Sequence, residues 1–334
     1  MRQSCPLPHK DYGVAQALKE SGEDEPISEP KHSLKKRLHA WWEGYELHPV
    51  SGDGAMPGGN AGDAADGGDG DAAAEEVPEW SPARQKLVQL IWGEGFVSPT
   101  TPEAVVDLAQ PFGLTVENTM LEIGSGPGGG ACAVAEKIGS YVDGFDLNSD
   151  LAKEALEASM LKGLEKKAVI KAFDPNNFEL KTNFYDGCLL RDTLVSIDDK
   201  DRFLEVVLSA VKPGKPIVIT ESFITAAEPG PLAVASIDGE PSEVFPCEAG
   251  LVIDKLEASN FEVRVNADET EQYTALACTA WVEMADKITG KDLDGDLAEA
   301  LVRETELWGR RSEAYAAGEL EMRRIVAFKK SNVS

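Results

Sequence analysis

Short apolar runs alternate with amphipathic stretches along the chain from about residue 82 onwards. The runs TMLEI (119–123), YVDGFD (141–146) and KPIVITESFI (215–224) are typical of buried strands, and segments with helical periodicity separate them. Parallel strands need such crossovers, and the helices then cover both faces of the sheet. The pattern predicts an α/β, Rossmann-like fold, with a mostly parallel seven-stranded sheet flanked by helices.

Composition divides the chain into three parts. Residues 1–50 are a polar N-terminal extension, 51–80 an acidic Gly/Ala/Asp-rich flexible linker, and 81–334 the compact domain. Within the extension, residues 32–47 (HSLKKRLHAWWEGYEL) predict a short Trp-rich helix. Packing of this helix on its own domain is the favoured interpretation, with a protein partner reached across the linker and a membrane surface as alternatives.

The formal net charge of −27 argues against a nucleic-acid partner and against an anionic membrane, because both would repel the chain. The N-terminus lacks the apolar segment of a signal peptide, and no run is long enough to span a bilayer, so a cytoplasmic protein is expected. The five cysteines lie far apart without metal-binding spacing, which predicts buried reduced thiols and no metal site.

A glycine-rich loop, LEIGSGPGGG (121–130), follows the first strand of the compact domain. Such a loop lies at the carboxyl edge of a parallel sheet, where open α/β folds bind ligands. It lacks the Gly-Lys-Ser/Thr ending of a P-loop, and it fits the dinucleotide pattern only if Gly124, Gly126 and Gly129 are taken together. The glycines alone therefore leave the ligand open.

Two acids beside this loop narrow the choice. Glu122 directly precedes the glycines, where a carboxylate repels a pyrophosphate and attracts a cation. Asp146 ends the next strand, where its oxygens can accept both hydroxyls of a ribose. Together they indicate a nucleoside with a positively charged tail, which describes S-adenosyl-L-methionine (SAM). Asp174, after the third strand, is predicted to meet the adenine amino group, with an Asx turn before Pro175 as the even alternative.

With these motifs in order, LEIGSGPGG, FDLN and VKPGKPIVITESF, the chain resembles the class I SAM-dependent methyltransferases over most of residues 85–330. The stretches IWGEGFVSPTTPEAV and LLRDTLVSIDDKDRFLEVVLSAVKPG resemble the phosphoethanolamine N-methyltransferase (methyltransferase type 11) group more closely, as a bacterial relative. The resemblance implies a lid over the methyl donor at residues 92–99. The predicted cofactor-binding residues are Val97, Ser98, Glu122, Gly124, Ser125, Gly126, Gly128, Asp146, Leu147, Asp174, Pro175 and Arg191.

The chain departs from that group where the acceptor chemistry belongs. The group pairs a Tyr with a His shortly after its Arg-Asp motif, whereas Ser196 stands at the His position here. All four histidines, His9, His32, His39 and His48, precede the linker. Val88 also replaces an aromatic residue expected near the cofactor. The resemblance therefore implies the same frame with a changed acceptor.

Methyl transfer from a sulfonium is an in-line displacement that needs alignment and exclusion of water more than it needs a base. If a proton must leave, the candidate catalytic residues are Asp192, Asp198 and Tyr273, each of which could equally be a capping, surface or packing residue. Arg191 could bind an acidic substrate group, anchor the lid, or form a salt bridge with a nearby acid.

Two functional hypotheses remain. The first is a SAM-dependent methyltransferase (EC 2.1.1.-) acting on N or O of a small molecule or lipid headgroup. The alternative is a methyltransferase-like binding or regulatory protein without turnover, which recruits a partner through residues 32–47. A nucleotide-sugar or NAD enzyme is a distant third.

Overall fold

The computed structural model describes residues 78–288 and 293–331 of the chain. The predicted Trp-rich helix at 32–47 and nearly all of the predicted linker lie outside the described residues, so both stay predictions.

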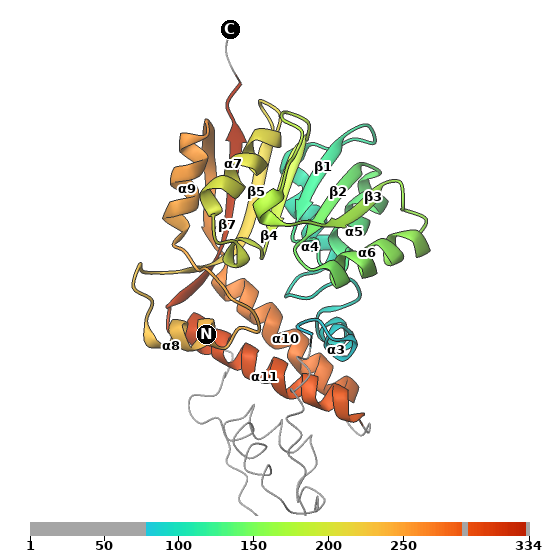
Figure 1. Ribbon diagram of the computed structural model, residues 1–334, viewed down its shortest axis with the longest axis vertical. Helices are drawn as coiled ribbons and strands as arrows, with labels where there is room; N and C mark the ends of the chain where they lie inside the picture. The colour runs from blue at the N-terminus through green and yellow to red at the C-terminus, as the bar shows by residue number, and fades with distance from the viewer. Residues whose placement is uncertain (1–77, 289–292, 332–334) are drawn as a thin grey trace, which may run out of the picture. The chain divides into compact units, whose positions relative to one another are not determined.

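One sheet of seven strands organises the described part of the chain, with the order β3-β2-β1-β4-β5-β7-β6 (Figure 1). The pairs among β1 to β5 are parallel, and β7 runs antiparallel to both β5 and β6. The predicted fold class is confirmed. The strands are β1 (Thr119–Ile123), β2 (Tyr141–Asp146), β3 (Ala168–Ala172), β4 (Gly187–Arg191), β5 (Pro216–Ile224), β6 (Phe261–Asp268) and β7 (Leu320–Lys329).

The last strand, β7, is inserted between β5 and β6 rather than added at an edge. It pairs with β5 along nine registered positions, from Pro216↔Phe328 to Ile224↔Leu320. An irregularity between Val263 and Val265 shifts its register with β6. Because β1 lies between β2 and β4, the connections reverse direction there, and this switch point is where open α/β sheets bind ligands.

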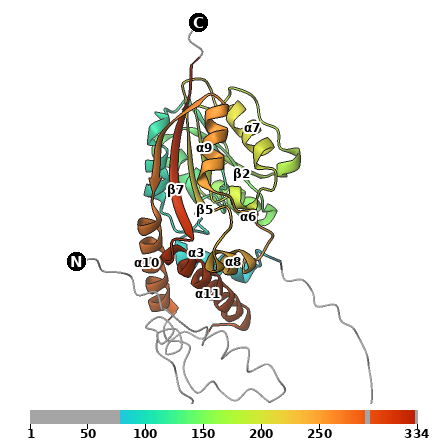
Figure 2. The ribbon, with the colours of Figure 1, turned by 90° about the vertical axis from the view of Figure 1, so that its left-hand side faces the viewer.

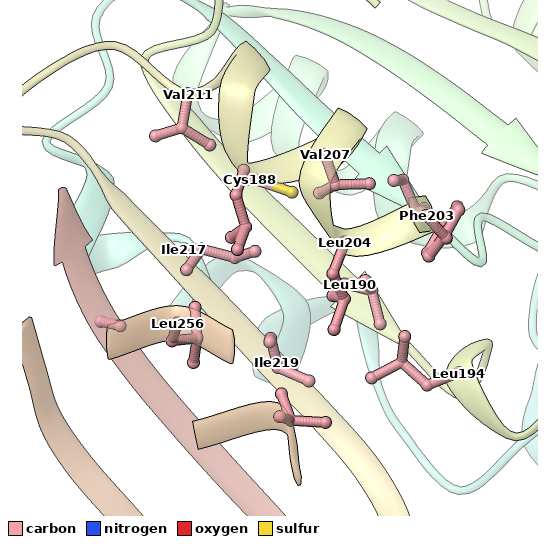
Figure 3. Close-up of a cluster of buried hydrophobic side chains, with 14 of the residues drawn as sticks. Cys188, Leu190, Leu194, Phe203, Leu204, Val207, Val211, Ile217, Ile219 and Leu256 are labelled. Carbon is pink, nitrogen blue, oxygen red and sulfur yellow. The ribbon is translucent and has the colours of Figure 1, made fainter. Parts of the chain in front are cut away.

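Helices cover both faces of the sheet. Helices α7 (Lys200–Ala210) and α9 (Ala249–Ala258) pack on one face in a continuous apolar core shared with β1, β4 and β5, as Figure 3 shows for 14 side chains. Helices α5 (Gly129–Ile138) and α6 (Ser149–Leu161) pack against β2 and β3. The alternation of buried side chains along β1 sends Leu121 into the α7/α9 core and Glu122 to the side of α5.

A helical cap lies beyond the carboxyl ends of the parallel strands in both views (Figures 1 and 2). It consists of α3 (Pro82–Trp92), α8 (Pro231–Asp238), α10 (Thr270–Ile288) and α11 (Gly295–Ala316). Trp92 of α3 packs on Trp308 with ring centroids 4.6 Å apart and on Trp281 at 6.3 Å.

Connecting elements complete the fold. Helix α4 (Pro102–Leu108) begins after Thr101, whose hydroxyl accepts the Ala104 N–H, and packs beside α5. Three short 3-10 helices follow other elements at Gln110–Phe112, Pro175–Asn177 and Leu194–Ser196.

Three cysteines of the described residues, Cys132, Cys188 and Cys247, are free thiols, and the first two are buried. Within the described ranges, no three His, Cys, Asp or Glu side chains are grouped to hold a metal ion. None of the described helices has both the length and the apolar character to cross a membrane.

Candidate cofactor and acceptor site

The glycine loop between β1 and α5 approaches two neighbouring segments too closely for side chains. Gly124 has φ +80°, and a Cβ there would collide with the carbonyl oxygen of Arg191 and the hydroxyl of Thr193. Gly126 has φ +51°, a backbone conformation that disfavours other residues. The loop therefore lies directly on the segment that follows β4, with bare backbone facing the carboxyl edge of the sheet.

Asp146 joins the end of β2 to this loop. Its Oδ2 accepts the Gly126 N–H at 2.7 Å, and its Oδ1 accepts the Asn148 N–H at 2.9 Å. Burial raises the pKa of this carboxyl, whereas the two backbone hydrogen bonds act to lower it. A carboxylate has about four lone-pair sites, so each oxygen retains capacity for a ribose hydroxyl. Asp146 is thus hydrogen-bonded to the glycine loop, and its predicted contact with a ribose stays a prediction.

Glu122 and Arg191 form a buried ion pair beneath the loop. Arg191 Nη2 lies 3.4 Å from Glu122 Oε1, and the Glu122 side chain is fully buried. Burial raises the pKa of Glu122 to about 7. Its Oε2 and the Nε of Arg191 have no hydrogen-bond partner in the protein. Of the three roles considered for Arg191, the structure contains the salt bridge, and the two unsatisfied atoms leave polar capacity for a ligand.

The N-terminus of α5 is a poor site for a phosphate group. The carbonyl oxygen of Gly95, in the lid, accepts the Gly129 N–H at 3.0 Å. A Cβ on Gly130 would collide with Glu122 Oε1, so the acid lies against the first turn of the helix. Phosphate sites need free N–H groups at a helix N-terminus and no nearby negative charge. The site therefore fits a cationic ligand rather than a pyrophosphate.

The predicted lid, residues 92–99, is anchored at three points. Besides the Gly95–Gly129 bond, Ser98 Oγ donates to Asp192 Oδ2 at 2.7 Å, and the Gly95 N–H donates to Gln89 Oε1 at 2.9 Å. Gln89 Nε2 in turn donates to Glu154 of α6 at 2.5 Å. Val97 lies over the loop, with its Cγ2 only 3.4 Å from where a Cβ on Gly126 would be. Sequence reasoning missed Gln89, whose polar side chain carried no signal within an amphipathic helix.

Asp174 has the capping role considered as the alternative. It ends the connection after β3, and its Oδ1 accepts the Asn176 N–H at 2.9 Å, which starts the 3-10 helix at Pro175. The exposed carboxylate keeps a lowered pKa because of these local hydrogen bonds. The Phe173 N–H donates to the Asp146 carbonyl oxygen at 3.0 Å, so Asp174 borders the same edge as the ribose candidate. Leu147 is half-buried beside Asp146 and packs on the core.

The three catalytic candidates have different surroundings. Asp192 follows β4, is exposed, and accepts the lid hydroxyl of Ser98. Tyr273 of α10 packs on Tyr315 with centroids 5.8 Å apart, and burial together with the charge of Asp192 raises its pKa well above the usual range. Asp198 is exposed before α7, near Lys200. The geometry brings Asp192 and Tyr273 toward the lid and the cap, and it leaves Asp198 outside that group.

Among the described residues, no histidine can form the Tyr–His pair that the resemblance to the phosphoethanolamine N-methyltransferases implies. Ser196 lies in the 3-10 helix after β4, and Val88 is buried in α3. All four histidines lie outside the described residues. Sequence reasoning also missed Glu221, a buried acid of β5 whose carboxylate accepts backbone N–H groups beside Asp192. The sequence feature that could have identified Glu221 is an acid within the mostly apolar strand IVITESFI (217–224).

Comparison with known families agrees with this geometry. Residues 121–219 match the family described as "Methyltransferase domain". This part of the chain matches a methyltransferase domain, and the seven-stranded sheet around it has the class I methyltransferase fold. This span begins in β1 and ends in β5, and it includes the glycine loop, Asp146 at the end of β2 and Asp192 after β4. It includes most of the predicted cofactor residues.

The chain is similar to phosphoethanolamine N-methyltransferase 2 of Caenorhabditis elegans, with 30% identity over 131 residues. That match covers 39% of this chain and 30% of the relative, so the chain spans only a minor part of the relative's length.

Solved structures share the fold. The Haemonchus contortus phosphoethanolamine N-methyltransferase 2 structure, in complex with phosphomonomethylethanolamine and S-adenosylhomocysteine, aligns with a TM-score of 0.62 and 20% identity over 74% of this chain and 57% of that one. The (4+2)-cyclase SpnF aligns with a TM-score of 0.60 and 16% identity, over 74% of this chain and 93% of that one. A fold shared with a cyclase leaves the reaction to be argued from the site.

The close approach at Gly124 predicts a large cost for an added methyl group. We expect Gly124→Ala to lower the free energy of unfolding by more than about 3 kcal/mol, the sum of a left-handed backbone penalty of about 1–2 kcal/mol and a steric clash with β4. Gly163→Ala is the matched control, because Gly163 has φ +68° with open space around its Cβ position. Gly163→Ala should lower the free energy of unfolding only by the left-handed backbone penalty. Urea unfolding measures both, and equal losses would contradict the close approach.

Proposed function

We propose that this domain binds SAM and moves its methyl group to N or O of a small-molecule or lipid-headgroup acceptor. One observation supports this most directly: the carboxylate of Asp146 is fixed to the glycine loop at 2.7 Å, while the adjacent helix N-terminus is capped and lined by an acid. That arrangement suits a ribose with a cationic tail and opposes a pyrophosphate.

The proposed cofactor contacts divide by chemistry. Asp146 would hold the ribose, Glu122 the cationic tail, and Leu147, Asp174 and Pro175 the side of the adenine. The lid and the glycine backbone would enclose the rest of the cofactor. These contacts come from Val97, Ser98, Gly124, Ser125, Gly126, Gly128 and Arg191. When bound, SAM supplies an activated methyl group on a sulfonium, so the protein's task is alignment and exclusion of water.

Asp192 is the proposed acceptor-orienting residue. Its carboxylate is exposed at the end of β4 and touches the lid through Ser98, so it lies between the cofactor side and the cap. An amine must reach the methyl group as the neutral base, and Asp192 or solvent can accept the proton that it loses. Tyr273, with its pKa raised by burial and by Asp192, keeps its proton at neutral pH, so it can donate a hydrogen bond but cannot act as a base.

The relatives favour an amine of the phosphoethanolamine type as the first acceptor to test. The alternative is a methyltransferase-like binding protein without turnover. It is kept open by Ser196 in place of a His and by the shared fold of a cyclase. A protein partner for residues 32–47, a bacterial origin and a cytoplasmic location stay predictions.

Loss of the Asp146 carboxylate should abolish tight cofactor binding. We expect Asp146→Asn to weaken S-adenosylhomocysteine binding by about 100-fold or more, because hydrogen bonds to a charged group contribute about 1.5–3 kcal/mol each. Asp143→Asn, earlier on the same strand, where Asp143 accepts from Tyr185 Oη at 3.0 Å, is the control and should bind within about threefold of wild type. Calorimetric titration measures both. A folded wild-type protein that binds neither SAM nor S-adenosylhomocysteine would overturn the proposal.

Turnover separates the enzyme from the binding protein. With methyl-labelled SAM, we expect labelled product from phosphoethanolamine or from the ethanolamine and lipid-headgroup amines screened beside it. We also expect none with Asp146→Asn, because the cofactor is not held. Cofactor binding without transfer to any acceptor of the screen would favour the binding protein instead.

The raised pKa of Glu122 predicts that cofactor affinity depends on pH. The carboxyl is protonated below about 7 and ionised above it, and only the ionised form attracts a cation. The amino group of S-adenosylhomocysteine stays protonated to about pH 7.7. Affinity should therefore rise by up to about tenfold per pH unit as pH approaches 7 from below, and Glu122→Gln should remove this dependence.

The pH dependence of the free energy of unfolding tests the raised pKa of Glu122 independently of cofactor binding. Between its unfolded pKa of 4.5 and about 7, Glu122 holds a proton in the folded protein that the unfolded chain has released. Its contribution to stability therefore falls as pH rises through this window. Urea unfolding should show that slope in the wild type and its loss in Glu122→Gln. An unchanged slope would mean that Glu122 is already ionised in the folded protein.

A further inference from the structure

Glu221 is a buried acid that the proposed chemistry does not use. It lies in β5 with a relative exposure of 1%. Its Oε2 accepts the Thr193 N–H at 2.8 Å and the Leu194 N–H at 2.6 Å, and its Oε1 accepts the Ser222 N–H at 3.2 Å. Burying a carboxyl is costly, and three N–H donors offset part of that cost. The acid therefore binds backbone rather than a basic side chain.

The backbone that it holds directly follows Asp192. Asp192 has φ +46°, a left-handed conformation that costs a non-glycine residue about 1–2 kcal/mol. Its N–H donates to the Thr220 carbonyl oxygen at 3.1 Å, and Thr193 Oγ1 donates to the Arg191 carbonyl oxygen at 2.7 Å. We call the left-handed turn of the backbone at Asp192 the corner. These bonds fix Arg191 and Asp192, and Glu221 fixes Thr193 and Leu194 after them.

The direction of the Asp192 side chain depends on this corner. In the left-handed conformation, its carboxylate reaches Ser98 of the lid at 2.7 Å and acts electrostatically on Tyr273 of the cap. Relaxation of the corner to a right-handed or extended conformation would redirect the Cα–Cβ bond and break the contact with Ser98. The buried carboxylate of Glu221 thus helps to set the position of the exposed carboxylate of Asp192.

We propose that Glu221 is a positioning residue: by holding the Thr193 and Leu194 amides, it fixes the left-handed corner that aims Asp192 at the methyl acceptor. The proposal rests on the proposed function, because it takes Asp192 as the acceptor-orienting residue. Glu221 itself touches neither cofactor nor acceptor.

Several titratable groups surround Glu221. The charge of Asp192, just after β4, acts on Glu221. Lys200 of α7 and Cys247, just before α9, also interact with it electrostatically. Tyr273 of α10 and Tyr315 of α11 do so from the helical cap. Burial and the charge of Asp192 raise the pKa of Glu221 to about 8, against the three N–H donors. Deprotonation strengthens its bonds to the corner, so the corner should tighten as pH rises through this range.

The experiment compares three variants of the full chain. Glu221→Ala removes the contacts, and Glu221→Gln keeps the shape but loses the titratable charge. Asp186→Ala is the control, because Asp186 accepts the Thr119 N–H at 3.2 Å and the Lys212 ammonium at 2.9 Å at the opposite end of β4. The readouts are amide hydrogen exchange at Thr193 and Leu194, S-adenosylhomocysteine affinity, and KM and kcat for phosphoethanolamine or the best acceptor of the screen.

We expect Glu221→Ala to lower the protection of the Thr193 and Leu194 amides by about tenfold or more, since each bond contributes about 0.5–1.5 kcal/mol to the neutral acid and about 1.5–3 kcal/mol to the carboxylate. The acceptor KM should rise by about tenfold while S-adenosylhomocysteine affinity changes by less than about threefold. Glu221→Gln should restore part of the KM and lose the change in kcat/KM between about pH 7 and 9 that the wild type shows. Asp186→Ala should lose stability but keep the wild-type KM.

The outcomes separate this proposal from the proposed function. Two results overturn the positioning role alone, provided that the wild type turns over. One is that Glu221→Ala leaves the protection of the Thr193 and Leu194 amides unchanged. The other is that Glu221→Ala has the same acceptor KM as Asp186→Ala. If Glu221→Ala does not fold, Glu221→Gln decides: a wild-type pH profile overturns the role. A wild type that neither binds S-adenosylhomocysteine nor methylates overturns the proposed function, and the positioning role falls with it even if the amides are protected.

Discussion

The close approach of the glycine loop to the end of β4 is the contact on which the site depends. Gly124 lies against the carbonyl oxygen of Arg191 with no room for a Cβ. This contact brings the carboxyl ends of β1 and β4 together, and the Gly126–Asp146 hydrogen bond adds the end of β2. Three adjacent strand ends are thus held as one unit. Because glycines leave Ser125 as the one polar side chain within Gly124–Gly128, most polar groups around the loop come from these strand ends and from the lid.

Those polar groups are mainly acids, and burial controls their chemistry. Glu122 and Glu221 are nearly inaccessible, and burial raises the pKa of each. Asp146 is better satisfied, because two backbone N–H groups oppose the effect of its burial. A set of acids at a helix N-terminus would destabilise a bound phosphate and stabilise a cation. The local electrostatics therefore agree with the shape of the loop, and both exclude the dinucleotide interpretation that spacing alone left open.

The sequence predicted what depends on local pattern and failed where contacts between distant segments decide. The strand–helix order and the pairing of Asp146 with the loop follow from periodicity and from the geometry of parallel sheets. The capping of Gly129 by Gly95 does not, because it requires the lid to fold back over α5. Glu221 was missed because its partners, Thr193 and Leu194, lie 27 or more residues away along the chain. Asp174 could not be decided, since the same side chain serves an Asx turn and borders the cofactor edge.

On the proposed function, specificity for the acceptor arises on the side of the site that faces the helical cap. The cofactor side is built from strand ends that this fold holds in place, and a cyclase shares the fold. The acceptor side combines Asp192, in a strained backbone conformation, with aromatic residues of α10 and α11. Burial and the charge of Asp192 raise the pKa of Tyr273, so this side chain keeps its proton and can donate a hydrogen bond. If the domain acts as proposed, the proton of the acceptor goes to Asp192 or to water. On that proposal, an amine, which gives up its proton easily, suits the site better than an alcohol does.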